Sequence, residues 1–236
     1  AIGISWYDIL WRQNLASSHA RLPSGLGHEM AGVVVAVGDG VDDLTVGDKV
    51  ASFPAESPND YPVYGEQIVL PRSALTRYPD VLSPIEASVH YTPLLIAYFA
   101  YVDLARVKPG QFALVTDASH CAGPSFVQLG KALGVRVIAA TKDSDEREYL
   151  LSLGAEKVIV TEEQDLLMQI NKFTDNRGVD VILDMVGRDY LQKNIACAAL
   201  DGMPVSIAFL ACSRVELGLM PGVLKLLTTA RPTPPP

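Results

Sequence analysis

The sequence is poor in several residue types, and each shortage argues against a class of protein. It holds three cysteines in 236 residues, an odd number with no pair at metal-ligand spacing. This disfavours a disulfide-stapled secreted scaffold and favours a reducing compartment, so we expect a cytoplasmic protein. Lysine and arginine total 19 against 27 aspartates and glutamates, and no basic cluster offers a phosphate-binding surface. We therefore expect no nucleic acid partner.

Long apolar runs are missing as well. The longest, from Tyr91 to Val102, is shorter than the roughly 20 residues that a membrane-spanning helix needs. We predict a buried helix there and no membrane segment. Hydrophobic residues make up 49% of the chain and charged residues 19%, which is typical of a globular protein with a sizeable core.

The apolar pattern changes along the chain and predicts two domains. Between residues 26 and 70, short valine-rich runs at Val33 to Val37 and Gln67 to Leu70 are separated by glycines and prolines, which predicts β structure. From Gln111 onward, five apolar runs alternate with helical patterns, which predicts an α/β doubly wound parallel sheet. The five runs are Phe112 to Thr116, Val135 to Ala140, Lys157 to Val160, Val179 to Met185 and Pro204 to Leu210. We assign the domains to residues 1–90 and 91–236.

Residues at helix ends support the second domain. Pro124 suits a first helical position, and Gly134 and Gly154 suit left-handed caps at helix ends. Asp143 and Glu146 have the spacing of a capping box.

The loop between the first strand and helix of this domain is the place where a Rossmann fold holds a pyrophosphate. Ala118 and Gly123 supply small residues there, but His120 and Cys121 stand where glycine is expected. An α/β domain that binds no nucleotide is the alternative. The predicted cofactor contacts in the loop, after the fourth strand and at the fifth run are Ala118, Ser119, His120, Cys121, Ala122, Gly123, Val186, Gly187 and Phe209.

Several motifs together resemble the medium-chain dehydrogenase/reductase superfamily. Gly27-His-Glu-Met-Ala-Gly32 and Val46-Gly-Asp-Lys-Val50 are similar to its signature, and Tyr64-Gly-Glu66, Leu153-Gly-Ala155 and Val179 to Gly187 resemble the quinone oxidoreductase-like branch. The resemblance implies a mostly β GroES-like catalytic domain ahead of a Rossmann domain, with the nicotinamide in the cleft between them. It also implies a quinone or α,β-unsaturated carbonyl as substrate, and a homodimer. Family chains have further strands before Ala1 and after Pro236, so we expect this chain to be a partial one.

The residues that replace the family's zinc ligands argue against a metal. Only His28 stands where the resemblance places a ligand, because Ser5 and Thr92 occupy the cysteine positions. A hydroxyl is a poor zinc ligand, so we predict no metal. A zinc-dependent alcohol dehydrogenase, suggested by His28-Glu29, remains an alternative.

Without a metal, hydrogen-bond donors must stabilise the negative charge that develops on the substrate oxygen. The resemblance places the hydroxyls of Ser5, Tyr7 and Tyr64 at the cleft, and we predict that these residues are catalytic. Trp6, Tyr7 and Trp11 could form an aromatic wall for a planar acceptor, or could equally be core residues.

The end of the second strand decides between the two dinucleotides. An NAD-selective fold places an acidic residue there, but in this chain that position is Ala140 or Thr141, followed by Lys142. We predict that Thr141 and Lys142 bind a 2′-phosphate with help from Arg147, which makes NADPH the cofactor, although acidic residues crowd the same turn. A solvated charged turn and a non-catalytic dinucleotide-binding protein are the alternatives.

Overall fold

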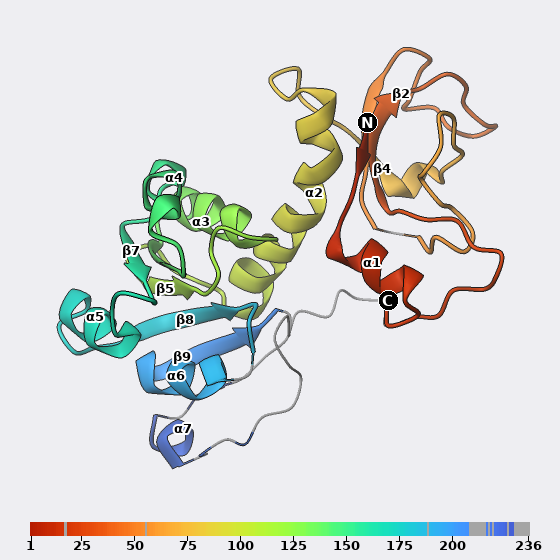
Figure 1. Ribbon diagram of the computed structural model, residues 1–236. Helices are drawn as coiled ribbons and strands as arrows, with labels where there is room; N and C mark the ends of the chain where they lie inside the picture. The colour runs from red at the N-terminus through yellow and green to blue at the C-terminus, as the bar shows by residue number, and fades with distance from the viewer. Residues whose placement is uncertain are drawn as a thin grey trace. The chain divides into compact units, whose positions relative to one another are not determined.

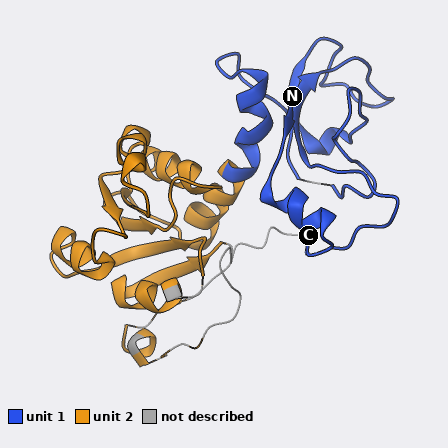
Figure 2. Cartoon of the chain, viewed as in Figure 1, with its two compact units in different colours: residues 1–93 blue, residues 94–236 orange. Residues whose placement is uncertain are grey.

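The computed structural model describes residues 1–16, 18–54, 56–187, 189–207, 216, 218, 220–225 and 227–228. The chain forms two compact units, residues 1–93 and 94–236 (Figure 2). The boundary falls inside helix α2, Pro84–Tyr98, between Pro93 and Leu94. Each unit is described by itself below.

Unit 1 contains a four-stranded antiparallel sheet in the order β1-β2-β3-β4. Its elements are β1 Ile2–Gly3, α1 Trp6–Arg12, β2 Glu29–Val33, β3 Lys49–Ser52, a 3₁₀ turn Arg72–Ala74 and β4 Leu75–Arg77. The predicted β character is present, but the predicted strands are misplaced. β2 ends at Val33, and residues 67–70 form no strand. In the described part of the chain no neighbouring strand pairs with Val35, Val37 or Val69, so these residues belong to no β-sheet. Their apolar side chains are exposed.

Unit 2 contains a five-stranded parallel sheet in the order β7-β6-β5-β8-β9 (Figure 1). The strands are β5 Phe112–Val115, β6 Arg136–Thr141, β7 Lys157–Val160, β8 Val179–Asp184 and β9 Ala198–Ser206. The doubly wound sheet is thus confirmed. β9 begins six residues before the predicted Pro204, because Ala198 pairs with Val179 ahead of a register shift.

Helices cover both faces of this sheet. They are α3 Gly123–Ala132, α4 Arg147–Leu153, α5 Leu166–Phe173 and α6 Asp189–Cys197. A 3₁₀ turn, Ser144–Glu146, precedes α4, and a short helix, α7 Met220–Leu224, contacts α6. Alternate strand residues face opposite sides, so Ala113 and Val115 join Phe126 in one core, whereas Phe112 and Leu114 join Ile170 in the other. Burial on both faces explains why the strands read as continuous apolar runs.

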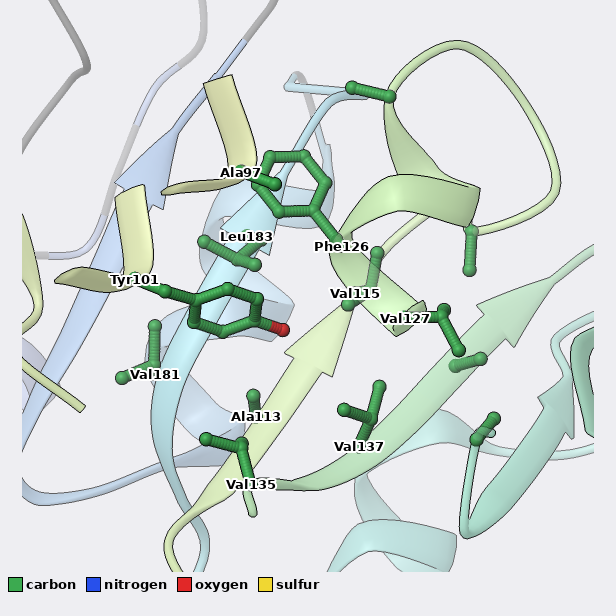
Figure 3. Packing of buried hydrophobic residues seen from close by; sticks show 14 of the residues in the cluster. Ala97, Tyr101, Ala113, Val115, Phe126, Val127, Val135, Val137, Val181 and Leu183 are labelled. Atoms are coloured by element: carbon green, nitrogen blue, oxygen red, sulfur yellow. The ribbon is translucent and has the colours of Figure 1, made fainter. Parts of the chain in front are cut away.

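Close packing of α3 on the sheet depends on Gly130. A Cβ there would lie 2.6 Å from a methyl of Val137 and 2.9 Å from the hydroxyl of Tyr101. Tyr101 is fully buried and packs edge to face on Phe126, with ring centroids 6.0 Å apart (Figure 3). Burial raises the pKa of the Tyr101 hydroxyl far above its ordinary value, so this residue is a core residue.

The apolar run from Tyr91 to Val102 is helical, as predicted, and continues α2 into a π-helical turn, Phe99–Leu104. No helix among the described residues is long and apolar enough to cross a membrane. The predicted caps are confirmed at Gly134 and Gly154, whose φ angles are +72° and +113°. Pro124 is the second residue of α3, because the helix begins at Gly123.

Candidate functional site

Three loops meet at the carboxyl edge of the unit 2 sheet. β5 pairs in parallel with β6 on one side and with β8 on the other, so the residues that follow these strands share one edge. The strand order reverses direction at β5, and ligands of open α/β sheets bind at such a switch point. The described residues of the predicted cofactor site lie at or beside this edge. Phe209 lies outside the described residues.

The loop after β5 folds back on itself and requires a glycine at position 123. The amide of Gly123 donates to the carbonyl of His120 at 2.8 Å, and the amide of His120 donates to that of Asp117 at 3.2 Å. A Cβ on Gly123 would lie 2.3 Å from the carbonyl oxygen of Ala118. Since backbone cannot move aside as a flexible side chain can, a larger residue would force the loop open.

Other positions of this loop depart from the glycine pattern. Asp117 and Cys121 both have φ of 50°, the left-handed region in which a glycine is less strained. In the described part of the chain, the amides of Ser119, Cys121 and Ala122 donate to no protein acceptor. Such free amides at the start of a helix suit an anionic phosphate group. Burial raises the pKa of the Cys121 thiol, so the group stays protonated at neutral pH.

Asp184, at the end of β8, is a site residue that sequence reasoning missed. Its carboxylate is 1% exposed and accepts from the hydroxyl of Thr116 at 2.9 Å and from the amide of Val186 at 3.0 Å. The amide of Gly187, where φ is +70°, also donates to it at 3.3 Å. Asp184 therefore ties the loop after β8 to the end of β5. In the sequence, the sign of this site is an aspartate at the end of an apolar run.

Glu146 is a second missed residue, and it corrects the predicted capping box. The Asp143 side chain accepts from the amide of Asp145 at 2.9 Å, whereas the Glu146 carboxylate accepts from the hydroxyls of Ser119, at 2.5 Å, and Thr141. The Glu146 carboxylate thus does not cap the turn that contains it. It accepts instead from one hydroxyl in the loop after β5 and one at the end of β6. Nε2 of His120 lies 3.8 Å from the same carboxylate.

The three residues predicted to hold a 2′-phosphate have different surroundings. Thr141 is 2% exposed and its hydroxyl donates to Glu146, so donation to a phosphate would require that bond to break. Arg147 is directed to the carbonyl of Val158 at 3.4 Å and to Glu163 at 3.8 Å. Lys142 is exposed beside the strand end. Of the three, Lys142 is the most exposed, and the Arg147 side chain is still 35% exposed.

In unit 1, Ser5 and Asp8 form the capping box of α1. The amide and hydroxyl of Ser5 donate to Oδ2 of Asp8 at 2.7 and 3.1 Å. Asp8 is 4% exposed, and its Oδ1 has no hydrogen-bond partner in the described part of the chain. Ser5 therefore has a structural task, and the buried Asp8 oxygen without a partner among the described residues is a polar feature that the sequence did not reveal.

The two predicted tyrosines differ in their contacts. Burial, and then the charge of Asp8, raise the pKa of the Tyr64 hydroxyl, which leaves it a protonated donor at neutral pH. The Tyr7 ring meets the His28 ring edge-on at 4.6 Å, and its hydroxyl lies 3.3 Å from that of Ser18. Trp11 is 2% exposed and belongs to the core, whereas Trp6 is exposed.

His28 and Glu29 lie beside these groups, His28 partly buried and Glu29 buried. Both ring nitrogens of His28 lack a hydrogen-bond partner among the described residues. Burial lowers the pKa of His28 and raises that of Glu29. Among the described residues, no three His, Cys, Asp or Glu side chains come together to hold a metal ion.

Comparison with known proteins places both units in one family. Residues 1–77 match the alcohol dehydrogenase GroES-like domain, and residues 123–229 match the zinc-binding dehydrogenase domain. Quinone oxidoreductase 1 of Escherichia coli is 31% identical over 93% of this chain and 66% of its own length. The Salmonella typhimurium quinone oxidoreductase is 30% identical over 87% of this chain and 62% of its own. The chain thus spans about two thirds of these relatives.

Solved structures agree with the sequence relatives. A quinone oxidoreductase of Pseudomonas syringae pv. Tomato shares 30% identity and a TM-score of 0.82, over 98% of this chain and 70% of that one. The Escherichia coli quinone oxidoreductase complexed with NADPH shares 28% identity and a TM-score of 0.84 over the same fractions. With its GroES-like and Rossmann-like domains, this chain belongs to the quinone oxidoreductase-like branch of the medium-chain dehydrogenase/reductase superfamily.

Proposed function

We propose that this chain is part of an NADPH-dependent oxidoreductase that reduces a quinone or an α,β-unsaturated carbonyl without a metal. The observation that supports it most is the loop after β5, where Gly123 packs on Ala118 and leaves three amides for a pyrophosphate. Bound there, the dinucleotide supplies the hydride. NADPH is favoured by Lys142 and by the cofactor named for the Escherichia coli structure.

The residues of unit 1 supply the polar groups for this chemistry. Tyr64 is 38% exposed and its hydroxyl is protonated at neutral pH, so it can donate to a substrate oxygen that gains negative charge. The charge of Asp8 also raises the pKa of that hydroxyl, after burial, and so helps to keep it protonated. Ser5 and Tyr7 are weaker candidates, because the Ser5 hydroxyl already caps α1 and the Tyr7 hydroxyl lies beside Ser18.

The absence of a metal is proposed from the ligand set. Ser5 and Thr92 provide hydroxyls where the family's zinc enzymes have thiolates, and His28 alone is a poor zinc site. A zinc-dependent alcohol dehydrogenase is the alternative that retention of a tightly bound metal would favour.

Oxidation of NADPH by the purified full-length protein, against a panel of quinones and enals, tests the proposal. Turnover with at least one class is expected, and Tyr64→Phe should lower kcat by about tenfold or more for loss of one donor to a developing charge. Dinucleotide binding without any turnover would favour the second candidate, a non-catalytic dinucleotide-binding protein. The non-glycine Cys121 in a left-handed conformation is the observation that favours that candidate.

We further propose that the protein is a cytoplasmic homodimer. The low cysteine count supports a reducing compartment, and homodimers are common in the family that this sequence resembles. Light scattering on the full-length protein and its distribution after cell fractionation test these two points.

A further inference from the structure

Glu146 connects the loop after β5 with the end of β6, the region in which this fold binds the adenosine ribose of a dinucleotide. Ser119 lies in the loop after β5 and Thr141 is the last residue of β6, and both hydroxyls donate to the same carboxylate oxygen of Glu146. The Glu146 side chain is 23% exposed, so the carboxylate is held in place yet open to a ligand.

The end of β6 therefore carries an acidic hydrogen-bond acceptor, which Glu146 supplies, although the last residue of the strand itself is Thr141. NAD-binding folds place an acidic side chain at the end of the second strand, where it accepts a hydrogen bond from the ribose 2′-hydroxyl. β6 is the second strand of unit 2. Glu146, five residues after Thr141, brings a carboxylate to the same strand end.

Nearby cations offset this carboxylate only in part. Arg147 contacts the carbonyl of Val158 at 3.4 Å and Glu163 at 3.8 Å, and no ion pair between Arg147 and Glu146 is seen among the described residues. Nε2 of His120 is 3.8 Å away, but Nδ1 of the same ring lies 3.1 Å from Asp117. Lys142 is exposed, and its long side chain is well hydrated. A 2′-phosphate would thus meet a fixed negative charge at close range, and like charges at such a distance repel even near the surface.

We propose that Glu146 limits the preference for NADPH over NADH: it accepts from the 2′-hydroxyl of NADH and opposes the 2′-phosphate of NADPH. This inference rests on the proposed dinucleotide site and refines its NADPH assignment. Attraction by Lys142 and repulsion by Glu146 act on the same phosphate in opposite directions. The chain is therefore expected to bind NADH and NADPH with affinities within about tenfold of each other.

The test is Glu146→Gln in the full-length protein, with Glu148→Gln as the matched control. The amide oxygen of glutamine can still accept from Ser119 and Thr141, so the loop keeps its bonds while the charge is removed. Glu148 is exposed on α4 and loses the same charge in the control. Each protein is titrated with NADPH, NADH, 2′,5′-ADP and AMP, and circular dichroism checks that all are folded.

Glu146→Gln is expected to bind NADPH and 2′,5′-ADP about tenfold more tightly, the size of one like-charge contact near a surface, with NADH and AMP unchanged or weaker. The gain should shrink at high salt. Equal changes for NADPH and NADH, or the same gain in Glu148→Gln, would overturn the inference and leave the dinucleotide site intact. If the wild type bound neither dinucleotide, the proposed function itself would fail, and the inference with it.

Discussion

The hydroxyl of Thr116 donates to the buried carboxylate of Asp184 at 2.9 Å, across the carboxyl ends of two neighbouring strands. The same hydroxyl accepts from the amide of Met185 at 3.1 Å. One threonine thus satisfies a buried charge and a buried amide, and both lie where the loop after β8 begins.

Thr116→Val should destabilise the protein by about 1 to 3 kcal/mol, because the isosteric valine leaves a buried carboxylate and an amide without this partner. Urea unfolding followed by circular dichroism measures the free energy. Thr76→Val, on half-buried β4, is the control and should change stability by less than about 0.5 kcal/mol. Equal effects of the two substitutions would show that the hydrogen bond to Asp184 does not contribute to the free energy of unfolding.

Gly123→Ala should weaken binding of either dinucleotide by about tenfold or more, since the added Cβ would lie 2.3 Å from the carbonyl oxygen of Ala118 and displace the loop. Gly38→Ala is the control, because a Cβ there meets no atom within 4 Å. Titration by fluorescence checks both variants. A folded Gly123→Ala protein with unchanged affinity would remove the basis for assigning this loop.

The pH dependence of stability should contain a contribution from His28. Burial lowers the pKa of His28 from its ordinary value of 6.5, so the unfolded state binds the proton more readily. The stabilising contribution is full above about pH 6.5 and is lost as the pH falls through that value toward the lower folded pKa. Glu29 acts in the opposite direction, because its raised pKa makes its contribution largest at low pH.

Unfolding free energies between about pH 5 and 7.5 test this in wild type and in His28→Asn. The wild type should lose stability toward pH 5 more steeply than the variant. The exposed His19, changed to asparagine, is the control and should keep the wild-type slope. A slope unaffected by His28→Asn would contradict the assignment.

Metal removal should leave the protein and its proposed activity unchanged. On the proposed metal-free assignment, Ser5 and Thr92 stand where zinc enzymes of the family carry thiolates, and no cluster of three ligands exists among the described residues. Purified protein should therefore contain well under one zinc per chain and retain NADPH oxidation in chelator. One tightly bound zinc that disappears in His28→Asn would show instead that His28 is a ligand.

The unit 2 sheet could be predicted from sequence because its strands are buried on both faces. Each strand therefore appears in the sequence as one continuous apolar run. The strands of unit 1 could not be predicted, since valines such as Val35 become a strand only where a neighbour pairs with them. Side-chain partners were hidden for a related reason. Glu146 and Ser119 are 27 residues apart, and Asp184 and Thr116 are 68 apart, so local spacing carried no signal of either contact.

Lys142 is the residue on which the NADPH assignment depends, since Thr141 and Arg147 already have other partners. Lys142→Glu should cost about 1.5 to 3 kcal/mol of NADPH binding energy, the range for a hydrogen bond to a charged group. That corresponds to an affinity roughly ten- to a hundredfold lower, with NADH hardly affected because it lacks the phosphate.

Lys108→Glu is the matched control for this charge reversal. Lys108 is exposed ahead of β5, at the opposite edge of the sheet from the end of β6, so it shares the charge change but not the site. Titrating both dinucleotides into the three proteins separates a local contact from a change in net charge. A loss of NADPH affinity that is equal in both variants, or equal for NADH, would show that Lys142 does not contact the phosphate.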